Sequence, residues 1–188
     1  EDVEGGFRYG GWTVPYFDDA VGAAMGESFD EELDLLLGRR TYDIFAAHWP
    51  HVSTDPGSST FDALNADVAR KFNAMTKYVA THRPESLAWQ NSEALGPDVV
   101  AGVRALKEQS GPTLITQGSS ELVHLLLAHD LIDELRLLTY PVLLGAGKRL
   151  FAGNVSARFE VVRTLTAPSG VIVAHYKRAG DVHTGSFG

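Results

Sequence analysis

The chain has 188 residues, of which 44% are hydrophobic, with 24 acidic against 16 basic side chains and no cysteine. This length predicts one domain with a substantial core, and the lack of cysteine excludes disulfides, a thiolate nucleophile and Cys-ligated zinc. The formal charge of -8 argues against nucleic acid and anionic membranes as partners, because both would repel the chain at long range.

The start of the chain is acidic and rich in glycine, like a loop entered from an upstream segment. No apolar run approaches the roughly 18–20 residues that span a bilayer, and no basic-then-apolar leader opens the sequence. We therefore expect a soluble, cytoplasmic protein that lacks an amino-terminal piece upstream of residue 1.

The predicted elements alternate between helices and strands. Residues 5–15 form a glycine-rich loop, and two extended runs near the carboxyl end flank a turn at 167–170. Between them we expect helices over 18–29, from 41, over 60–75, over 97–109 and around 122–129, and strands over 33–37, 77–80, 113–116 and 135–140. The order predicts an α/β domain with a mixed sheet and a carboxyl-terminal antiparallel hairpin.

The segment Gly38-Arg39-Arg40-Thr41 joins a predicted strand to a helix. Two arginines at a helix amino terminus oppose the helix dipole, unless an anion binds there. Helix amides, guanidinium groups and the Thr41 hydroxyl could all bind a phosphate. The alternative is two solvated arginines with Thr41 as an ordinary helix cap.

Two further strand ends carry polar residues. Gln117-Gly118-Ser119-Ser120 precedes a predicted helix and is typical of a pyrophosphate cradle, or else of plain turn and capping chemistry. Thr81-His82-Arg83 ends another strand, and ligands of open α/β sheets bind beyond such carboxyl ends. Because Arg39, Arg40 and Arg83 would suit a 2′-phosphate, the pattern favours NADP over NAD.

The sequence does not contain the residue spacing of a P-loop or of a common metal-binding motif. Gly145-Ala146-Gly147-Lys148-Arg149 has neither the earlier glycine nor the Ser/Thr of a P-loop. The seven histidines include no HExxH pair, so we expect no metal site. Asp18 and Asp19 are candidates for a proton-relaying carboxylate, with helix capping as the alternative.

Taken together, these segments resemble the dihydrofolate reductase-like superfamily, in the branch of the carboxyl-terminal reductase domain of the riboflavin enzyme RibD. Tyr140-Pro141-Val142-Leu143-Leu144-Gly145 adds to the likeness. The resemblance implies a three-layer fold with a mixed central sheet and flanking helices. It implies that NADPH is bound by Gly38, Arg39, Arg40, Thr41, Thr81, His82, Gly118, Ser119, Ser120 and Leu122, with the nicotinamide near Trp12 and Thr139-Tyr140. To these cofactor candidates we add Arg83, Gln117 and Thr139, and we take Trp12, Asp18 and Tyr140 as catalytic candidates.

Two departures from the family pattern bear on the substrate. Trp12-Thr13-Val14-Pro15 matches dihydrofolate reductases, but Phe17 stands where they carry a carboxylate, which argues against dihydrofolate. The family's first strand would lie upstream of residue 1.

The resemblance implies an NADPH-dependent reductase of a small heterocyclic or carbonyl/imine substrate, similar to 5-amino-6-(5-phosphoribosylamino)uracil reductase. The alternatives are a dihydrofolate reductase and a non-catalytic NADP-binding module. The resemblance also implies a homodimer.

Overall fold

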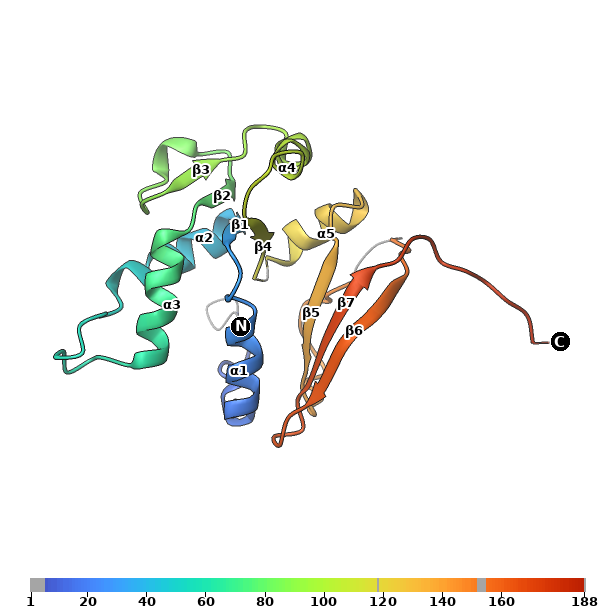
Figure 1. The fold of residues 1–188 in the computed structure, drawn as a ribbon, viewed down its shortest axis with the longest axis horizontal. Helices are drawn as coiled ribbons and strands as arrows, with labels where there is room; N and C mark the ends of the chain where they lie inside the picture. The colour runs from blue at the N-terminus through green and yellow to red at the C-terminus, as the bar shows by residue number, and fades with distance from the viewer. Residues whose placement is uncertain (1–5, 118, 152–154, 188) are drawn as a thin grey trace. The chain divides into compact units, whose positions relative to one another are not determined.

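The computed structural model describes residues 6–117, 119–151 and 155–187. The chain divides into two compact units (Figure 1). Residues Glu31–Leu131 form one, here named the parallel unit, and Glu1–Asp30 with Ile132–Gly188 form the other, the antiparallel unit. No helix of the described ranges is both long and apolar enough to cross a membrane.

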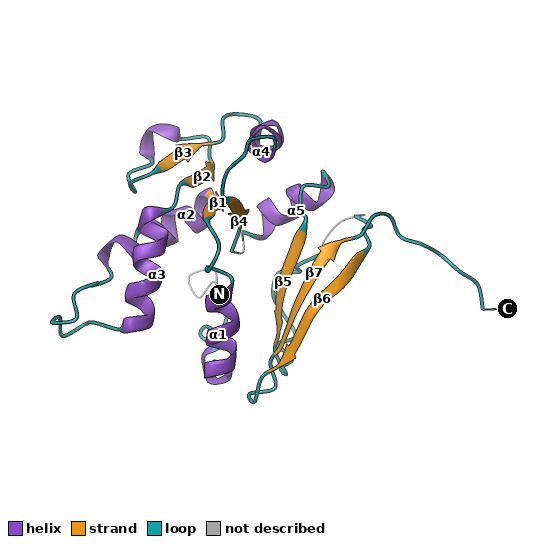
Figure 2. Cartoon of the chain, viewed as in Figure 1, coloured by secondary structure: helices purple, strands orange, loops and turns teal. Residues whose placement is uncertain are grey.

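The parallel unit is built on a four-stranded sheet of order β3-β2-β1-β4, in which every pairing is parallel. Its strands are β1 (Leu33–Gly38), β2 (Lys77–Ala80), β3 (Ser92–Ala94) and β4 (Thr113–Ile115). Its helices are α2 (Arg39–Ala46), α3 (Ala63–Ala74), α4 (Val99–Lys107) and α5 (Ser120–Ala128), with short 3-10 turns η2 (Trp49–His51) and η3 (Pro84–Ser86) (Figure 2).

The core of the parallel unit surrounds β1, whose six residues are all buried. Its four leucines suit a central parallel strand, because both of its faces are covered, and Asp34 is buried among them with its Oδ1 accepting from the Thr76 amide at 2.8 Å. Aromatic packing continues the core beyond the sheet. The rings of Phe45 and Phe72 stack at 5.7 Å, and Trp49 meets Phe72 edge-on at 5.1 Å.

The antiparallel unit contains η1 (Val14–Tyr16), α1 (Asp19–Glu27) and a three-stranded antiparallel sheet of order β5-β7-β6. Its strands are β5 (Glu134–Thr139), β6 (Phe159–Thr166) and β7 (Ile172–Arg178). Val21 of α1, Ala167 and Val171 form its buried core, against which Leu138 packs. Helix α1 therefore covers the face of the sheet to which Leu138 belongs.

The α/β class and the carboxyl-terminal hairpin predicted from the sequence are confirmed, and the strands are divided between a parallel and an antiparallel sheet. Strand β3 was not predicted. Its three residues, Ser92, Glu93 and Ala94, are too few and too polar to show a strand period, and pairing with β2 supplies their structure.

Candidate functional site

The carboxyl ends of β1 and β2 lie side by side in the parallel unit. Gly38 at the end of β1 pairs with Ala80 at the end of β2. Helix α2 starts directly at Arg39, and Thr81 follows β2. Because parallel strands end at the same edge of a sheet, the two segments that carry Arg39 and Thr81 form one polar edge.

Arg39 connects the two segments through its guanidinium group. Its Nε donates to both carboxylate oxygens of Asp43, at 2.9 and 3.0 Å. Its Nη1 donates to Ser86 Oγ at 2.5 Å and to the Arg83 carbonyl at 3.2 Å. The hydrogen bond with Asp43 raises the pKa of Arg39 above its ordinary value, so the group is a permanent cation. Its charge is held at the sheet edge in a fixed orientation.

Thr81 is the buried member of this edge, with 9% of its surface exposed. Its Oγ1 accepts from the Arg83 amide at 3.0 Å and from Arg39 Nη1 at 3.4 Å. Both bonds use the oxygen as an acceptor, and the hydroxyl donates to none of the described residues, so its proton can be donated to a ligand. The side chains of His82 and Arg83, which follow it, are exposed.

Helix α2 begins at Arg39, whereas a helix capped by Thr41 would begin at Tyr42. Gly38 is the N-cap, without a side-chain hydrogen bond, so the alternative with Thr41 as cap is wrong. Thr41 lies inside the first turn, half-buried, and Arg40 is exposed. The amino-terminal amides of α2 therefore have no capping side chain, which is the arrangement in which a helix end can bind an anion.

The turn after β4 approaches the end of β1 closely. A Cβ built on Gly38 would lie 3.2 Å from the Cβ of Ser119, closer still to its hydroxyl oxygen, and 3.9 Å from the Cβ of Leu122. Ser119 is the N-cap of α5, with a left-handed backbone (φ 63°) and no capping hydrogen bond from its side chain. Glycine at position 38 thus brings the amino termini of α2 and α5 together.

The remaining candidates of this turn differ in exposure. Gln117 and Ser120 are half-buried, whereas Leu122 is buried and packs toward Gly38. Gly118 lies outside the described residues.

The catalytic candidates lie in the antiparallel unit. The rings of Trp12 and Tyr140 meet edge-on at 4.9 Å, and Tyr16 meets Tyr140 edge-on at 6.0 Å. Tyr16 and Tyr140 pack against the core of the unit. Thr139, exposed, ends β5 immediately before Tyr140. The three rings form an aromatic cluster of a kind that can contact a planar ligand.

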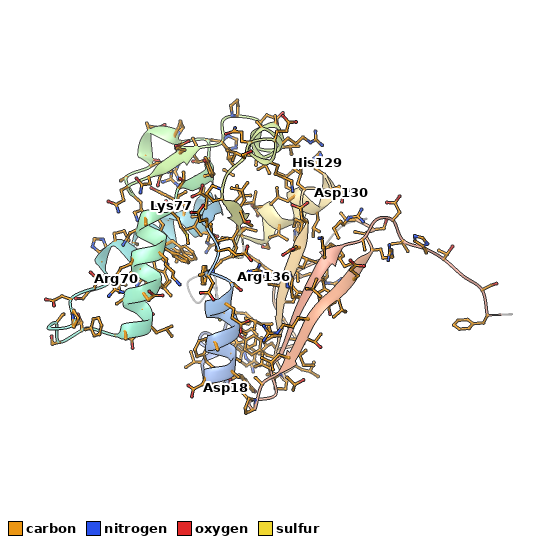
Figure 3. All side chains as sticks on the ribbon, in the orientation of Figure 1. Asp18, Arg70, Lys77, His129, Asp130 and Arg136 are labelled. Carbon is orange, nitrogen blue, oxygen red and sulfur yellow. The ribbon has the colours of Figure 1, made fainter. Side chains whose placement is uncertain are left out.

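Asp18 fastens α1 to the turn between β6 and β7 (Figure 3). Its Oδ1 accepts from the Val21 amide at 2.9 Å, and its Oδ2 accepts from the Ser169 amide at 2.8 Å. These two backbone bonds, that of Val21 first, lower the pKa of Asp18. The carboxylate is ionised near neutral pH and does not donate a proton there. The geometry thus favours the capping role over the proton relay.

The same turn supports Pro141, the neighbour of Tyr140. Gly170 has a φ of 84°, and a Cβ there would lie 3.2 Å from Pro141 Cγ. Because Asp18 binds Ser169 in this turn, one carboxylate holds the helix and the turn that underlies Pro141.

Sequence analysis missed two residues that shape the edge of the parallel sheet. Asp43 had a usable signal, because it follows Arg39 by four residues on one helix face. Ser86 had none, since it lies 47 residues from Arg39 in sequence. Only the pairing of β1 with β2 brings Ser86 to the guanidinium group.

Comparisons with known proteins agree with this architecture. The family model of the RibD C-terminal domain matches residues 17–173. The uncharacterized protein YyaP of Bacillus subtilis (strain 168) is 27% identical over 151 residues, which are 79% of this chain and 76% of YyaP.

Two solved structures share the fold. A putative riboflavin biosynthesis protein from Shewanella sp. PV-4 is 20% identical with a TM-score of 0.57, over 87% of this chain and 81% of that one. A pyrimidine reductase-like protein from Corynebacterium diphtheriae is 11% identical with a TM-score of 0.54, over 89% of this chain and 84% of that one.

Proposed function

Because the chain belongs to the RibD C-terminal domain family, we propose that it is an NADPH-dependent reductase of a small heterocyclic or carbonyl/imine substrate. The activity would be similar to that of 5-amino-6-(5-phosphoribosylamino)uracil reductase. The observation that carries the proposal is the Arg39 cation, oriented at the carboxyl edge of the parallel sheet by Asp43, Ser86 and the Arg83 carbonyl.

The residues of this edge fit a dinucleotide phosphate. The amino termini of α2 and α5 meet at Gly38 and Ser119, where the side chain of Ser119 leaves no room for a larger residue at position 38. The amino-terminal amides of α2, which has no capping side chain, the Arg39 cation and the Thr81 hydroxyl are all donors, which is the donor set that anionic phosphates need. We assign the phosphates of NADPH to this edge, with Arg40, Thr41, His82, Arg83, Gln117, Gly118 and Ser120 as further cofactor candidates.

The protein's part in the reaction is binding and orientation. When bound, the cofactor supplies the hydride. Trp12 and Tyr140 are the candidates for contact with a planar substrate, since their rings form the aromatic cluster with Tyr16. Asp18 acts as a positioning residue, because its ionised carboxylate holds α1 and the β6–β7 turn. Thr139, next to Tyr140, remains a cofactor candidate.

A non-catalytic NADP-binding module is the second candidate function. It is favoured by Phe17, which stands where dihydrofolate reductases carry a carboxylate, and by the lowered pKa of Asp18, which argues against this carboxyl as a proton donor. Tight NADPH binding without turnover on aminopyrimidines or folates would favour the module. Oxidation of NADPH that depends on an added substrate would exclude it.

Cofactor binding is tested by titration with NADPH and NADH, followed by tryptophan fluorescence. Replacement of Arg39 by alanine should weaken NADPH binding about tenfold or more, since hydrogen bonds to charged groups contribute about 1.5–3 kcal/mol, and should affect NADH less. Arg70→Ala is the control, because Arg70 is an exposed cation of α3 beside Asp67. Absence of NADPH binding at millimolar concentration would contradict the proposal.

We also propose that the protein is a homodimer, as the family resemblance implies. Light scattering at micromolar concentration tests this, and a mass of one chain would contradict it.

A further inference from the structure

The cation proposed to bind the cofactor is already paired with a carboxylate of its own helix. Asp43 contacts Arg39 Nε through both oxygens and is 47% exposed. Glu85, in η3, adds a second negative charge that acts on Arg39 through space. An anion that approaches the guanidinium group therefore meets negative charge beside the positive one.

The contacts of Arg39 leave one edge of the guanidinium group for a ligand. Nε faces Asp43, and Nη1 faces Ser86, the Arg83 carbonyl and Thr81. Nη2 makes no hydrogen bond to any residue in the described ranges. Since a guanidinium group is planar, contacts at Nε and Nη1 also fix the direction in which the two N–H groups of Nη2 point.

We propose that Asp43 is a specificity-determining residue: it limits how strongly the site prefers a nucleotide with a 2′-phosphate over one with a free 2′-hydroxyl. The inference rests on the proposed function, because it concerns the nucleotide that Arg39 is proposed to bind. Asp43 orients Arg39, but its charge opposes a phosphate at Nη2.

The sign of the effect follows from the charges of the two nucleotides. A phosphate monoester carries about -1.5 to -2 charges near neutral pH, so it is repelled by a carboxylate on the same guanidinium group. A 2′-hydroxyl carries no charge and is affected much less. Removal of the Asp43 charge should therefore strengthen binding of the 2′-phosphate nucleotide alone.

The orientation of Arg39 does not depend on Asp43 alone. Ser86 Oγ accepts from Nη1 at 2.5 Å, and the Arg83 carbonyl accepts at 3.2 Å. An asparagine at position 43 also retains an oxygen that can accept from Nε. Asp43→Asn thus removes the charge while leaving the guanidinium group held from two elements.

The experiment compares 2′,5′-ADP with 5′-AMP, and NADPH with NADH, by calorimetric titration of the wild type and the D43N variant. We expect D43N to bind 2′,5′-ADP about 2- to 5-fold more tightly, the range that exposed ion pairs produce, with 5′-AMP unchanged. The gain should shrink as salt is added, because salt screens exposed charges.

Asp67→Asn is the matched control, since it removes the same charge from an exposed carboxylate that pairs with Lys71 and Arg70 within α3. D67N should leave both affinities unchanged. An equal gain in D67N would show an effect of net charge and would overturn the assignment of Asp43.

Ser86→Ala separates orientation from charge. Loss of this hydroxyl removes an uncharged restraint on Arg39, so 2′,5′-ADP should bind more weakly, in the direction opposite to D43N. If D43N also weakens binding, or leaves the preference between the two nucleotides unchanged, the inference is wrong although the proposed function stands. If the wild type binds none of the four nucleotides, the proposed function itself fails, and the inference fails with it.

Discussion

Strands β1 and β6 show how differently the two units use their sheets. Every residue of β1 is buried, whereas most residues of β6 are exposed, including Val161 and Val162. A central parallel strand has both faces covered, so its side chains are mostly apolar, and the one charged side chain of β1, Asp34, is buried and accepts from the Thr76 amide. The polar groups of the proposed phosphate site lie at the carboxyl edge of the sheet, where the strands end.

The two units also differ in how far their charged side chains are buried. In the antiparallel unit the charged side chains of the sheet form partly exposed contacts beside α1: Arg163 pairs with Glu27 of α1, and His175 Nε2 lies 2.8 Å from Glu134 Oε2. The parallel unit instead buries a lysine. Lys77 is 0% exposed, and its Nζ donates to three backbone carbonyls at the end of α3, those of Phe72, Asn73 and Met75 (Figure 3).

The largest change in the free energy of unfolding is expected from the difference in side-chain burial between β1 and β6. Leu35→Ala should lower the free energy of unfolding by about 2–5 kcal/mol, because it leaves a cavity at a side chain with 0% exposure. Val161→Ala, at 59% exposure, should change it by less than about 0.5 kcal/mol. Urea unfolding of both variants measures the difference, and equal costs would contradict the contrast.

Lys77→Met should lower the free energy of unfolding by about 1–3 kcal/mol, because three carbonyls lose a buried donor. The variant also removes the ammonium group that lies 4.5 Å from the centre of the Trp89 ring, so tryptophan emission should shift.

The same lysine predicts a pH dependence. Burial lowers the pKa of Lys77 from 10.5 to about 8. Between these values the unfolded chain binds more protons at this group than the folded chain does, so its contribution to stability rises with pH from about 8 to 10.5. Urea unfolding across this range should show a rise in the wild type relative to K77M. Parallel pH profiles of the two proteins would contradict the burial of a charged lysine.

Gly38→Ala should cost about 1–3 kcal/mol, since the new methyl group meets Ser119 in a packed contact. Ser119→Gly should restore most of that loss, because it removes the opposing side chain. By itself Ser119→Gly should stabilise the fold by roughly 1 kcal/mol, as the left-handed backbone of residue 119 suits glycine. Thermal unfolding of the two single variants and the double variant tests the contact, and additive effects would contradict it.

The smallest change in stability is expected on replacement of Asp18, which caps a short helix of the antiparallel unit. Asp18→Ala should lower the melting temperature near neutral pH, whereas Asp19→Ala, at an exposed position that caps nothing, should not. The pKa of Asp18 is lowered from 3.8, so its stabilisation is present above this value and is lost as the pH falls below it. A difference between wild type and D18A that persists in acid would contradict the assigned role.

The sequence predicted elements best where burial repeats with a regular period. The strand expected over 33–37 is β1 (Leu33–Gly38), and the helix expected over 60–75 contains α3 (Ala63–Ala74). Strand β3 was missed because it has three residues and depends on β2 for its hydrogen bonds. The resemblance to the RibD C-terminal family is confirmed over residues 17–173.

The partners of the site residues were predicted less well than the residues themselves. Arg39 was expected at a helix amino terminus, and it begins α2. Its bond to Ser86 was not foreseeable, because the two residues are joined through the pairing of β1 with β2. At Asp18, proton relay and capping both suited the sequence, and the choice between them depends on the Ser169 amide in a distant turn.

The amino-acid sequence by itself determined the α/β class, the position of Arg39 at the start of a helix and the family, because these depend on local periodicity and on motifs within short segments. Only the tertiary structure decided that Arg39 also binds Ser86, that Asp18 binds the Ser169 amide and that Lys77 is a buried lysine. These partners and this burial depend on which distant segments meet in space, and no local pattern encodes them.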